Sequence, residues 1–155
     1  MNTRSEPPMQ AADWFSQFDD FTYNPIETVQ TNFTRLAKVR KWGAKLKSKR
    51  WVQCQTALFG SLYGTDTTKL EIWQELCRDV LIDEPPNSIT KCKELLGSRQ
   101  VLVNLVNLVE HRMSGEPVIR FSCYRAWREY TVQGRTYPRK AAKEDGFIKA
   151  LLRKL

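Results

Sequence analysis

Helix start and stop signals divide this sequence into short segments, and no other feature constrains its fold as strongly. Asn24–Glu27 combines a capping residue, a proline at the first helical position and a glutamate three residues past the cap. Apolar residues then recur at helical spacing as far as Gly43, which predicts a first long helix. Ser48 predicts the start of a second helix that ends at Gly64, and the capping box Thr68–Glu71 predicts a third.

The second half of the chain continues in the same way. Ser88 opens a short helix after the turn at 83–86, and 101–113 (VLVNLVNLVEHRM) has a helical period because Asn104, Asn107 and His111 recur at i, i+3 and i+7. Its β-branched residues favour a strand instead, and we predict a mostly buried helix from the period of the polar positions. The stretch 117–121 (PVIRF) is the best candidate for an extended segment.

Two further helices complete the predicted fold, one capped by Ser122 and a last one from about Pro138, although Gly146 costs the latter roughly 1 kcal/mol. We therefore expect a mainly α fold, a compact single domain of six or seven helices over 13–155, with one short extended segment near 117–121 and a flexible tail at 1–12. The predicted core combines the apolar positions of these helices: Trp51, Leu58, Leu70, Trp73, Leu76, Leu105, Val109, Leu151 and Leu152.

Charge is distributed along the chain in blocks. The net charge is +8, yet residues 28–65 contain eight Lys and Arg and no Asp or Glu. Residues 135–154 form a second basic block, with seven basic residues and two acidic ones. Blocks of this kind predict charged faces on the folded chain.

The sequence lacks the patterns that carry most enzyme chemistry. It has no glycine-rich phosphate loop and no H-E-x-x-H, and its one histidine, His111, has no clustered cysteines beside it to make a zinc site. Cys54, Cys77 and Cys92 fall at apolar helix positions, which predicts buried, reduced thiols. We expect no enzyme, with no catalytic residues, no metal and no cofactor.

The densest basic stretch is KVRKWGAKLKSKRW, residues 38–51. Cations grouped at a helix start suit a phosphate backbone, so this stretch predicts nucleic-acid or other polyanion binding through a helix-turn-helix-like face, with Arg50, Gln53 and Thr56 pointing outward. The alternative is a solvated turn on which Trp42 and Trp51 cover the core. The predicted polyanion-binding residues are Lys38, Arg40, Lys41, Lys45, Lys47, Lys49, Arg50 and Gln53.

Aromatic and acidic residues alternate in DWFSQFDDFTYNP, residues 13–25. Such an arm either packs over the first helix or docks on a partner, and the second reading makes the protein an adaptor, including as a homodimer. The partner-binding residues of that alternative are Trp14, Phe15, Phe18 and Phe21. An arm lying on residues 38–50 would neutralise part of the basic stretch.

Apolar residues never run for more than three positions, and the first ten residues lack the apolar core of a signal peptide. We therefore expect no membrane segment and an intracellular protein. If the partner is nucleic acid, the nucleus is favoured over the cytoplasm.

Many short motifs together resemble a small helical domain of unknown function that recurs in predicted proteins of filamentous fungi. They include Lys41-Trp42, Ser48-Lys49-Arg50-Trp51, LEIWQELCRDV at 70–80, VNLVNLV at 103–109 and GFIKALL at 146–152. The resemblance covers residues from about 13 to 155. It implies a fungal intracellular protein with a single domain, and it implies no catalytic residues.

Overall fold

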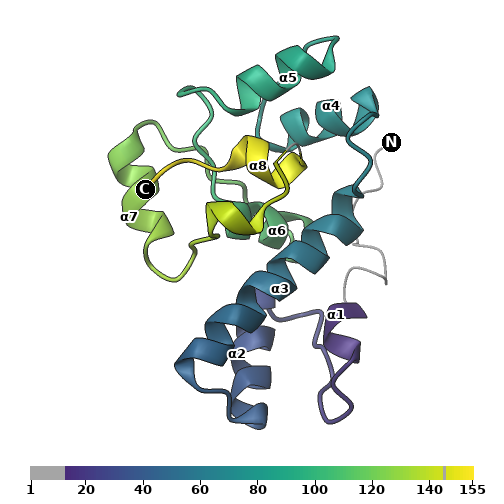
Figure 1. Cartoon of the computed structure of the whole chain (residues 1–155), viewed down its shortest axis with the longest axis vertical. Coiled ribbons are helices and arrows are strands. Elements are labelled where there is room, and N and C mark those ends of the chain that lie inside the picture. Colours follow the sequence, from purple (N-terminus) through teal and green to yellow (C-terminus); the bar gives the residue numbers. More distant parts are fainter. Residues whose placement is uncertain (1–12, 145) are drawn as a thin grey trace. The chain divides into compact units, whose positions relative to one another are not determined.

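The computed structural model describes residues 13–144 and 146–155, and these form eight α-helices and one 3-10 helix (Figure 1). The elements in chain order are α1 (Asp13–Ser16), α2 (Val29–Arg40), α3 (Ala44–Tyr63), α4 (Leu70–Asp79), α5 (Ile89–Leu96), α6 (Leu105–Ser114), α7 (Tyr124–Thr131), η2 (Arg139–Ala141) and α8 (Phe147–Leu151). Within the described residues no strand forms, and an isolated antiparallel bridge joins Leu102 to Phe121, at the end of the predicted extended segment. The mainly α prediction is confirmed. The predicted tail at 1–12 lies outside the described residues.

Contacts divide the chain into two compact units. Unit 1 comprises the described residues up to Gly64 together with Val109–Glu116, and unit 2 comprises Thr65–Leu108 and Pro117–Leu155. Helix α6 contributes its first residues to unit 2 and the remainder to unit 1. The single domain expected for 13–155 stays a prediction.

Each unit has its own buried apolar residues. Those of unit 1 include Phe15, Val29, Phe33, Leu36, Leu58 and Phe59, and those of unit 2 include Trp73, Leu76, Cys92, Leu96, Val101 and Leu108. Six predicted core residues are buried: Leu58, Trp73, Leu76, Leu105, Val109 and Leu151. The prediction is wrong for Trp51, Leu70 and Leu152, which are only half-buried; Leu70 is the first residue of α4, and Leu152 follows the last residue of α8.

Side-chain hydrogen bonds of two tryptophans and one asparagine connect segments of unit 2. The indole N–H of Trp73 donates to Thr67 O at 2.9 Å, and that of Trp127 donates to Val103 O at 2.9 Å. Asn104 starts α6, since its side-chain oxygen accepts from the N–H groups of Val106 and Asn107. The Asn104 amide also donates to the Thr131 hydroxyl, which ties α7 to the start of α6. The helical reading of the 101–113 stretch is therefore right from Leu105 onward.

Several predicted helix starts are wrong. Helix α4 begins at Leu70 because the Thr68 hydroxyl and N–H both donate to Asp66, which leaves Thr68 in a turn. The N-cap of α7 is Cys123 rather than Ser122. The last helix begins after Gly146, whose extended backbone separates α8 from the 3-10 helix η2. Ser88 caps α5 as predicted, accepting from Lys91 N–H.

Candidate polyanion-binding surface

A three-residue turn joins α2 to α3 and positions the two helix ends that carry the candidate site. Lys41 ends α2 in the left-handed conformation, at φ 56°, and Trp42 N–H donates to Ala37 O at 3.0 Å. Gly43 is then extended and is the N-cap of α3, with its carbonyl accepting from Lys47 N–H. Short turns of this length join the two helices of an αα-hairpin or helix-turn-helix unit.

The densest basic stretch is therefore mostly helical. The prediction that the second helix starts at Ser48 is wrong. Ser48 lies inside α3, which begins at Ala44. Gly43 is the N-cap instead of Ser48: its backbone is extended, and its carbonyl accepts the first hydrogen bond of the helix. As a result Lys45, Lys47 and Lys49 project from the first two turns of a helix.

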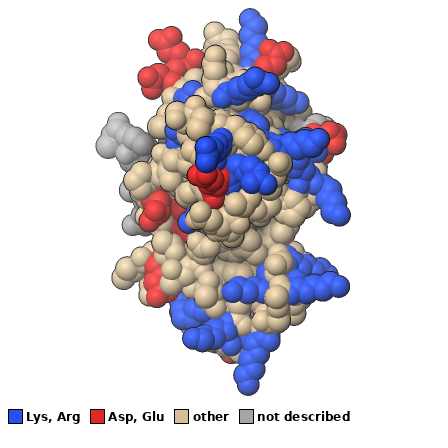
Figure 2. All heavy atoms as spheres, turned by 90° about the vertical axis from the view of Figure 1, so that its left-hand side faces the viewer, with Lys and Arg blue, Asp and Glu red and all other residues tan. Residues whose placement is uncertain are grey.

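We call the surface formed by the end of α2 and the start of α3 the basic corner: Lys38, Arg40, Lys41, Lys45, Lys47, Lys49 and Arg50. All of these side chains are exposed except that of Arg50, which is half-buried. In Figure 2 the α2–α3 turn lies at the lower end of the view, and Lys and Arg side chains gather there with few Asp or Glu among them. The structure thus brings the predicted cations together within unit 1.

Few of these charges are neutralised. Arg40 pairs with Asp20 at 3.0 Å, and its guanidinium also lies 5.0 Å from the centre of the Phe18 ring. The acidic-aromatic arm thus covers one cation of the corner. Five lysines make no ion pair with any described residue: Lys38, Lys41, Lys45, Lys47 and Lys49.

Arg50 and Gln53 are engaged with unit 1 itself. The Arg50 guanidinium lies 5.6 Å from the centre of the Trp42 ring, and its Nη1 donates to Gln53 Oε1 at 3.1 Å. The Thr56 hydroxyl, predicted to point outward with them, donates to Val52 O within α3. These three side chains therefore have intramolecular partners, whereas the five lysines are open to a ligand.

The start of α3 adds backbone donors to this charge. No side chain caps it, no acidic residue lies in its first turn, and the N–H groups of Ala44, Lys45 and Leu46 have no acceptor among the described residues. A helix N-terminus carries partial positive charge, so lysines in this turn cost roughly 0.3–1 kcal/mol each. An anion bound there would remove this cost and accept the free N–H groups.

Aromatic rings pack against one another next to the basic corner. Phe33 of α2 contacts Trp14, Trp42 and Trp51, with the Trp51 ring centre 4.8 Å away. Trp42 and Trp51 are half-buried, as the alternative reading of a core lid required. The rings hold the α2–α3 turn in place, so the lysines project from a rigid base.

The acidic-aromatic arm packs on unit 1, as one of its two readings predicted. Phe15 and Phe18 are buried and Trp14 and Phe21 half-buried, while α1 contacts α3. The Arg35 guanidinium lies 4.5 Å from the centre of the Phe21 ring. Most of the aromatic surface of the arm is therefore buried within unit 1.

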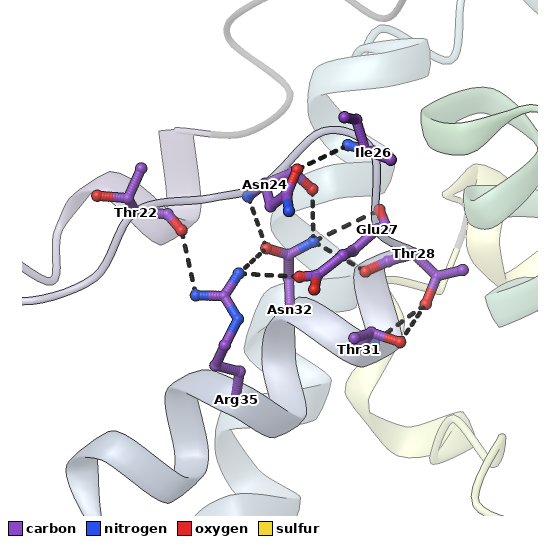
Figure 3. Close-up of polar contacts among 8 residues, drawn as sticks. All are labelled: Thr22, Asn24, Ile26, Glu27, Thr28, Thr31, Asn32 and Arg35. Atoms are coloured by element: carbon purple, nitrogen blue, oxygen red, sulfur yellow. Dashed lines mark hydrogen bonds and ion pairs between the residues drawn. The ribbon is translucent and has the colours of Figure 1, made fainter.

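A polar network holds the chain between the arm and α2 (Figure 3). Asn32, which is fully buried, donates to Asn24 O and Thr28 O and accepts from Asn24 N–H at 2.8 Å. Its oxygen also accepts from Arg35, which in turn pairs with Glu27 at 3.0 Å. The network fixes 24–28 as a turn, so α2 starts after Thr28 and the predicted cap at Asn24 is wrong.

Sequence reasoning missed Glu110, which belongs to unit 1. Its carboxylate is buried and accepts from Val29 N–H, Gln30 N–H and the Ser114 hydroxyl. Burial raises the pKa of Glu110, while the hydrogen bonds from Val29, Gln30 and Ser114 oppose this shift. A glutamate at helical spacing gives no sequence signal of burial, so this cap could not be recognised without the fold.

The surroundings of the cysteine thiols and of the histidine are those of residues that stabilise the fold. Cys54, Cys77 and Cys92 are buried as predicted, and Cys123 is exposed. Burial raises the pKa of Cys54 well above its ordinary value and that of Cys77 to about 12, so both thiols stay protonated near neutrality. His111 Nδ1 is 2.8 Å from Glu116 O. No cluster of three His, Cys, Asp or Glu suited to a metal ion occurs in the described part of the chain.

Among the described helices none is both long enough and apolar enough to cross a membrane. Comparison of the chain with known protein families, curated protein sequences and solved structures finds no match. The resemblance to a helical domain of filamentous fungi stays a prediction.

Proposed function

We propose that the basic corner of unit 1 binds a polyanion, and that the polyanion is nucleic acid. The observation that carries this proposal is the group of five lysines without ion pairs around the uncapped start of α3. A folded chain normally offsets dense positive charge with nearby carboxylates, whereas residues 28–65 contain none. The missing negative charge is what a phosphate backbone supplies.

Nucleic acid fits the corner better than a single small anion. The lysines extend from Lys38, on the last turn of α2, to Lys49, on the second turn of α3. One phosphate cannot reach all of them, but successive phosphates of a backbone can. A short turn followed by a basic second helix also suits docking of the α3 start against a groove.

Lysine contacts to phosphates carry little sequence information. Since Arg50 and Gln53 bond to each other, base-edge contacts would require that pair to open. We therefore propose a non-enzymatic, largely sequence-tolerant binder that acts in the nucleus. The adaptor alternative keeps no comparable support, because Phe15 and Phe18 are interior residues.

The test is a titration of short labelled duplex and single-stranded oligonucleotides, followed by fluorescence anisotropy. The variant K45E/K47E/K49E reverses three exposed lysines that lack partners in the described chain. Its matched control, K69E/K91E/R99E, makes the same change in net charge at exposed positions of unit 2, outside the second basic block. We expect the first variant to lose binding and the control to retain most of it.

Equal losses in both variants would mean that net charge alone attracts the oligonucleotide. Wild-type protein that binds no better than K45E/K47E/K49E at low salt would mean that the corner is only solvated. Circular dichroism of each variant checks that the helices remain folded.

A further inference from the structure

Unit 2 contains a cavity of about 190 Å³ that the basic corner does not involve. Its walls come from the start of α6, from α7, from the segment through η2 and from the end of α8 and the residues after it. Apolar side chains line much of it, including Val103, Trp127, Tyr137 and Leu151, of which all four are buried. The cavity is thus a mainly apolar space inside a folded unit.

Three arginines also line the cavity, and no acidic residue does. Arg135, Arg139 and Arg153 form no ion pair with any described carboxylate. Charged groups in protein interiors are normally paired, because desolvation of an unpaired charge is costly. The cavity lining therefore carries three cationic side chains and no Asp or Glu side chain.

Arg153 shows the imbalance most clearly. Its two terminal nitrogens donate only to backbone carbonyls, among them Ser98 O at 3.0 Å and Leu151 O at 3.0 Å. Its Nε is buried and has no hydrogen-bond partner. Carbonyl dipoles orient this guanidinium, yet they do not neutralise its charge.

Arg135 is held beside the same space. Its guanidinium lies 4.0 Å from the centre of the Tyr130 ring, and Nη1 donates to Tyr130 O at 3.1 Å. The Asn104 amide fixes its backbone by donating to Arg135 O. Arg139, on η2, is exposed, and its side chain makes no hydrogen bond or ion pair with another described residue.

The other polar donors that line the cavity are already used. Trp127 Nε1 donates to Val103 O, and the Asn104 amide donates to Thr131 and Arg135. The terminal nitrogens of Arg153 also donate to carbonyls, so the donors left for a ligand are mainly those of Arg135 and Arg139. A ligand that complements it must offer acceptors and negative charge, together with an apolar body.

We propose that this cavity binds a small organic carboxylate about the size of benzoate. An apolar cavity of about 150 Å³ accepts benzene, so a volume of about 190 Å³ accommodates a ring with one carboxylate. The carboxylate lies against Arg135 and Arg139, as planar guanidinium groups favour, and the ring lies against Trp127 and Leu151.

The experiment follows backbone amide NMR shifts of the full chain during titration with three probes: benzoate, phenyl phosphate and the neutral benzyl alcohol. We expect benzoate to shift amides near 103–105, 135–139 and 151–153 and to bind about tenfold more tightly than benzyl alcohol, because only benzoate offers a charged acceptor. Comparable affinity for the alcohol would overturn the proposal. So would tighter binding of phenyl phosphate than of benzoate, since the ligand class would then be a phosphate.

Arg139→Gln is the variant of choice, since Arg139 supports no other described residue, whereas loss of Arg153 would also free several carbonyls. We expect the affinity of R139Q for benzoate to be lower than that of the wild type by a factor of about three or more. Lys140→Gln is the matched control, because Lys140 is the exposed neighbour and does not line the cavity. Arg135→Gln provides the second measurement. Unchanged benzoate affinity in both arginine variants, or no binding to the wild type, would overturn the site.

Discussion

The carboxylate of Glu110, in α6, accepts a hydrogen bond from the backbone N–H of Val29, the first residue of α2, at 3.0 Å. Its second oxygen accepts from Gln30 N–H at 2.9 Å. A negative charge at this end of a helix satisfies two donors and complements the helix dipole. Glu110 therefore positions the helix whose far end carries Lys38 and Arg40.

Replacing Glu110 with glutamine should lower the free energy of unfolding by about 1–3 kcal/mol. The amide group has a single acceptor oxygen, so one of the two backbone N–H groups loses its partner. Urea unfolding of E110Q measures the effect. The control is Asp19→Asn, which neutralises an exposed carboxylate of the same unit and should change stability little. Equal stability of E110Q and the wild type would contradict the capping role.

The stability gap between the wild type and E110Q should narrow as pH rises above about 4.5. Burial raises the pKa of Glu110, so the native state holds its proton to higher pH than the unfolded state does. The pH-dependent part of this group's contribution, which comes from the shift in its pKa, is complete below the unfolded pKa and is lost as pH rises through the folded pKa. E110Q has no such titration.

Tyr23, Cys54 and Glu116 all interact with Glu110, and Glu116 raises its pKa further. The pKa of Tyr23 is raised to about 12 by burial first and by Glu110 second, and the pKa of Cys54 is raised well above its ordinary value by the same two causes. Neither group titrates between pH 4.5 and neutrality. Urea titrations at several pH values check the prediction, and a gap that widens with pH would contradict it.

Reversing Lys45 to Glu should raise the free energy of unfolding by about 0.3–1 kcal/mol, even as it weakens oligonucleotide binding. The reason is that an acidic side chain complements the start of α3, where a lysine opposes the helix dipole. Lys38→Glu is the matched control, since it makes the same charge change in the last turn of α2, where an acid is unfavourable. We expect K38E to lower stability, and thermal unfolding compares the two. Equal effects in both variants would exclude the helix dipole as the cause.

Binding of the wild type through four phosphates should give a log–log slope of affinity against salt of about −3.6 on duplex DNA. Removing one contact with Lys45→Gln should reduce the slope to about −2.7. Lys91→Gln, an exposed change in unit 2, should leave it unaltered. Titrations from about 50 to about 200 mM salt measure all three slopes. A slope near zero for the wild type would point to apolar contacts instead.

Shortening Phe18 to alanine should destabilise the protein by about 3–5 kcal/mol. Phe18 is 6% exposed, and its ring centre lies 5.2 Å from that of Trp14 and 5.5 Å from that of Trp42. Asp19→Ala, at the exposed neighbouring position, should cost far less. Equilibrium unfolding in urea gives both values. If F18A unfolded at the wild-type urea concentration, Phe18 would be free to anchor a partner.

Local signals predicted the helices well where their partners are near in sequence. Ser88 caps α5 through Lys91 N–H, and Gly64 ends α3 with a positive φ that suits glycine. The same signals failed at Asn24, whose oxygen bonds Ile26 N–H in a turn while Asn32 binds its backbone.

The start of α2 was predicted wrongly because the carboxylate of Glu110, far along the chain, binds its first N–H groups. The start of α4 was predicted wrongly for a local reason, since Asp66 holds Thr68 in a turn. Exposure of the lysines in the basic corner could be predicted from the sequence, since lysine without nearby acid is exposed in almost any fold, while their role in binding stays a prediction. That they project from a helix rather than a loop followed from Gly43, which resembled a stop signal and is the N-cap of α3.

The position of Glu110 in the chain also has a consequence for synthesis, because the carboxylate that caps α2 is made after α2 and α3. The ribosome releases α2 and α3 well before Glu110, so for that interval the first N–H groups of α2 have no carboxylate to meet. A nascent chain that ends near Gly64 therefore carries the basic residues of 28–64 before the carboxylate that caps α2 has been made. The same reasoning warns against excising 13–64 as a minimal binding fragment, because the missing piece of unit 1 is encoded 45 residues downstream, at Val109–Glu116.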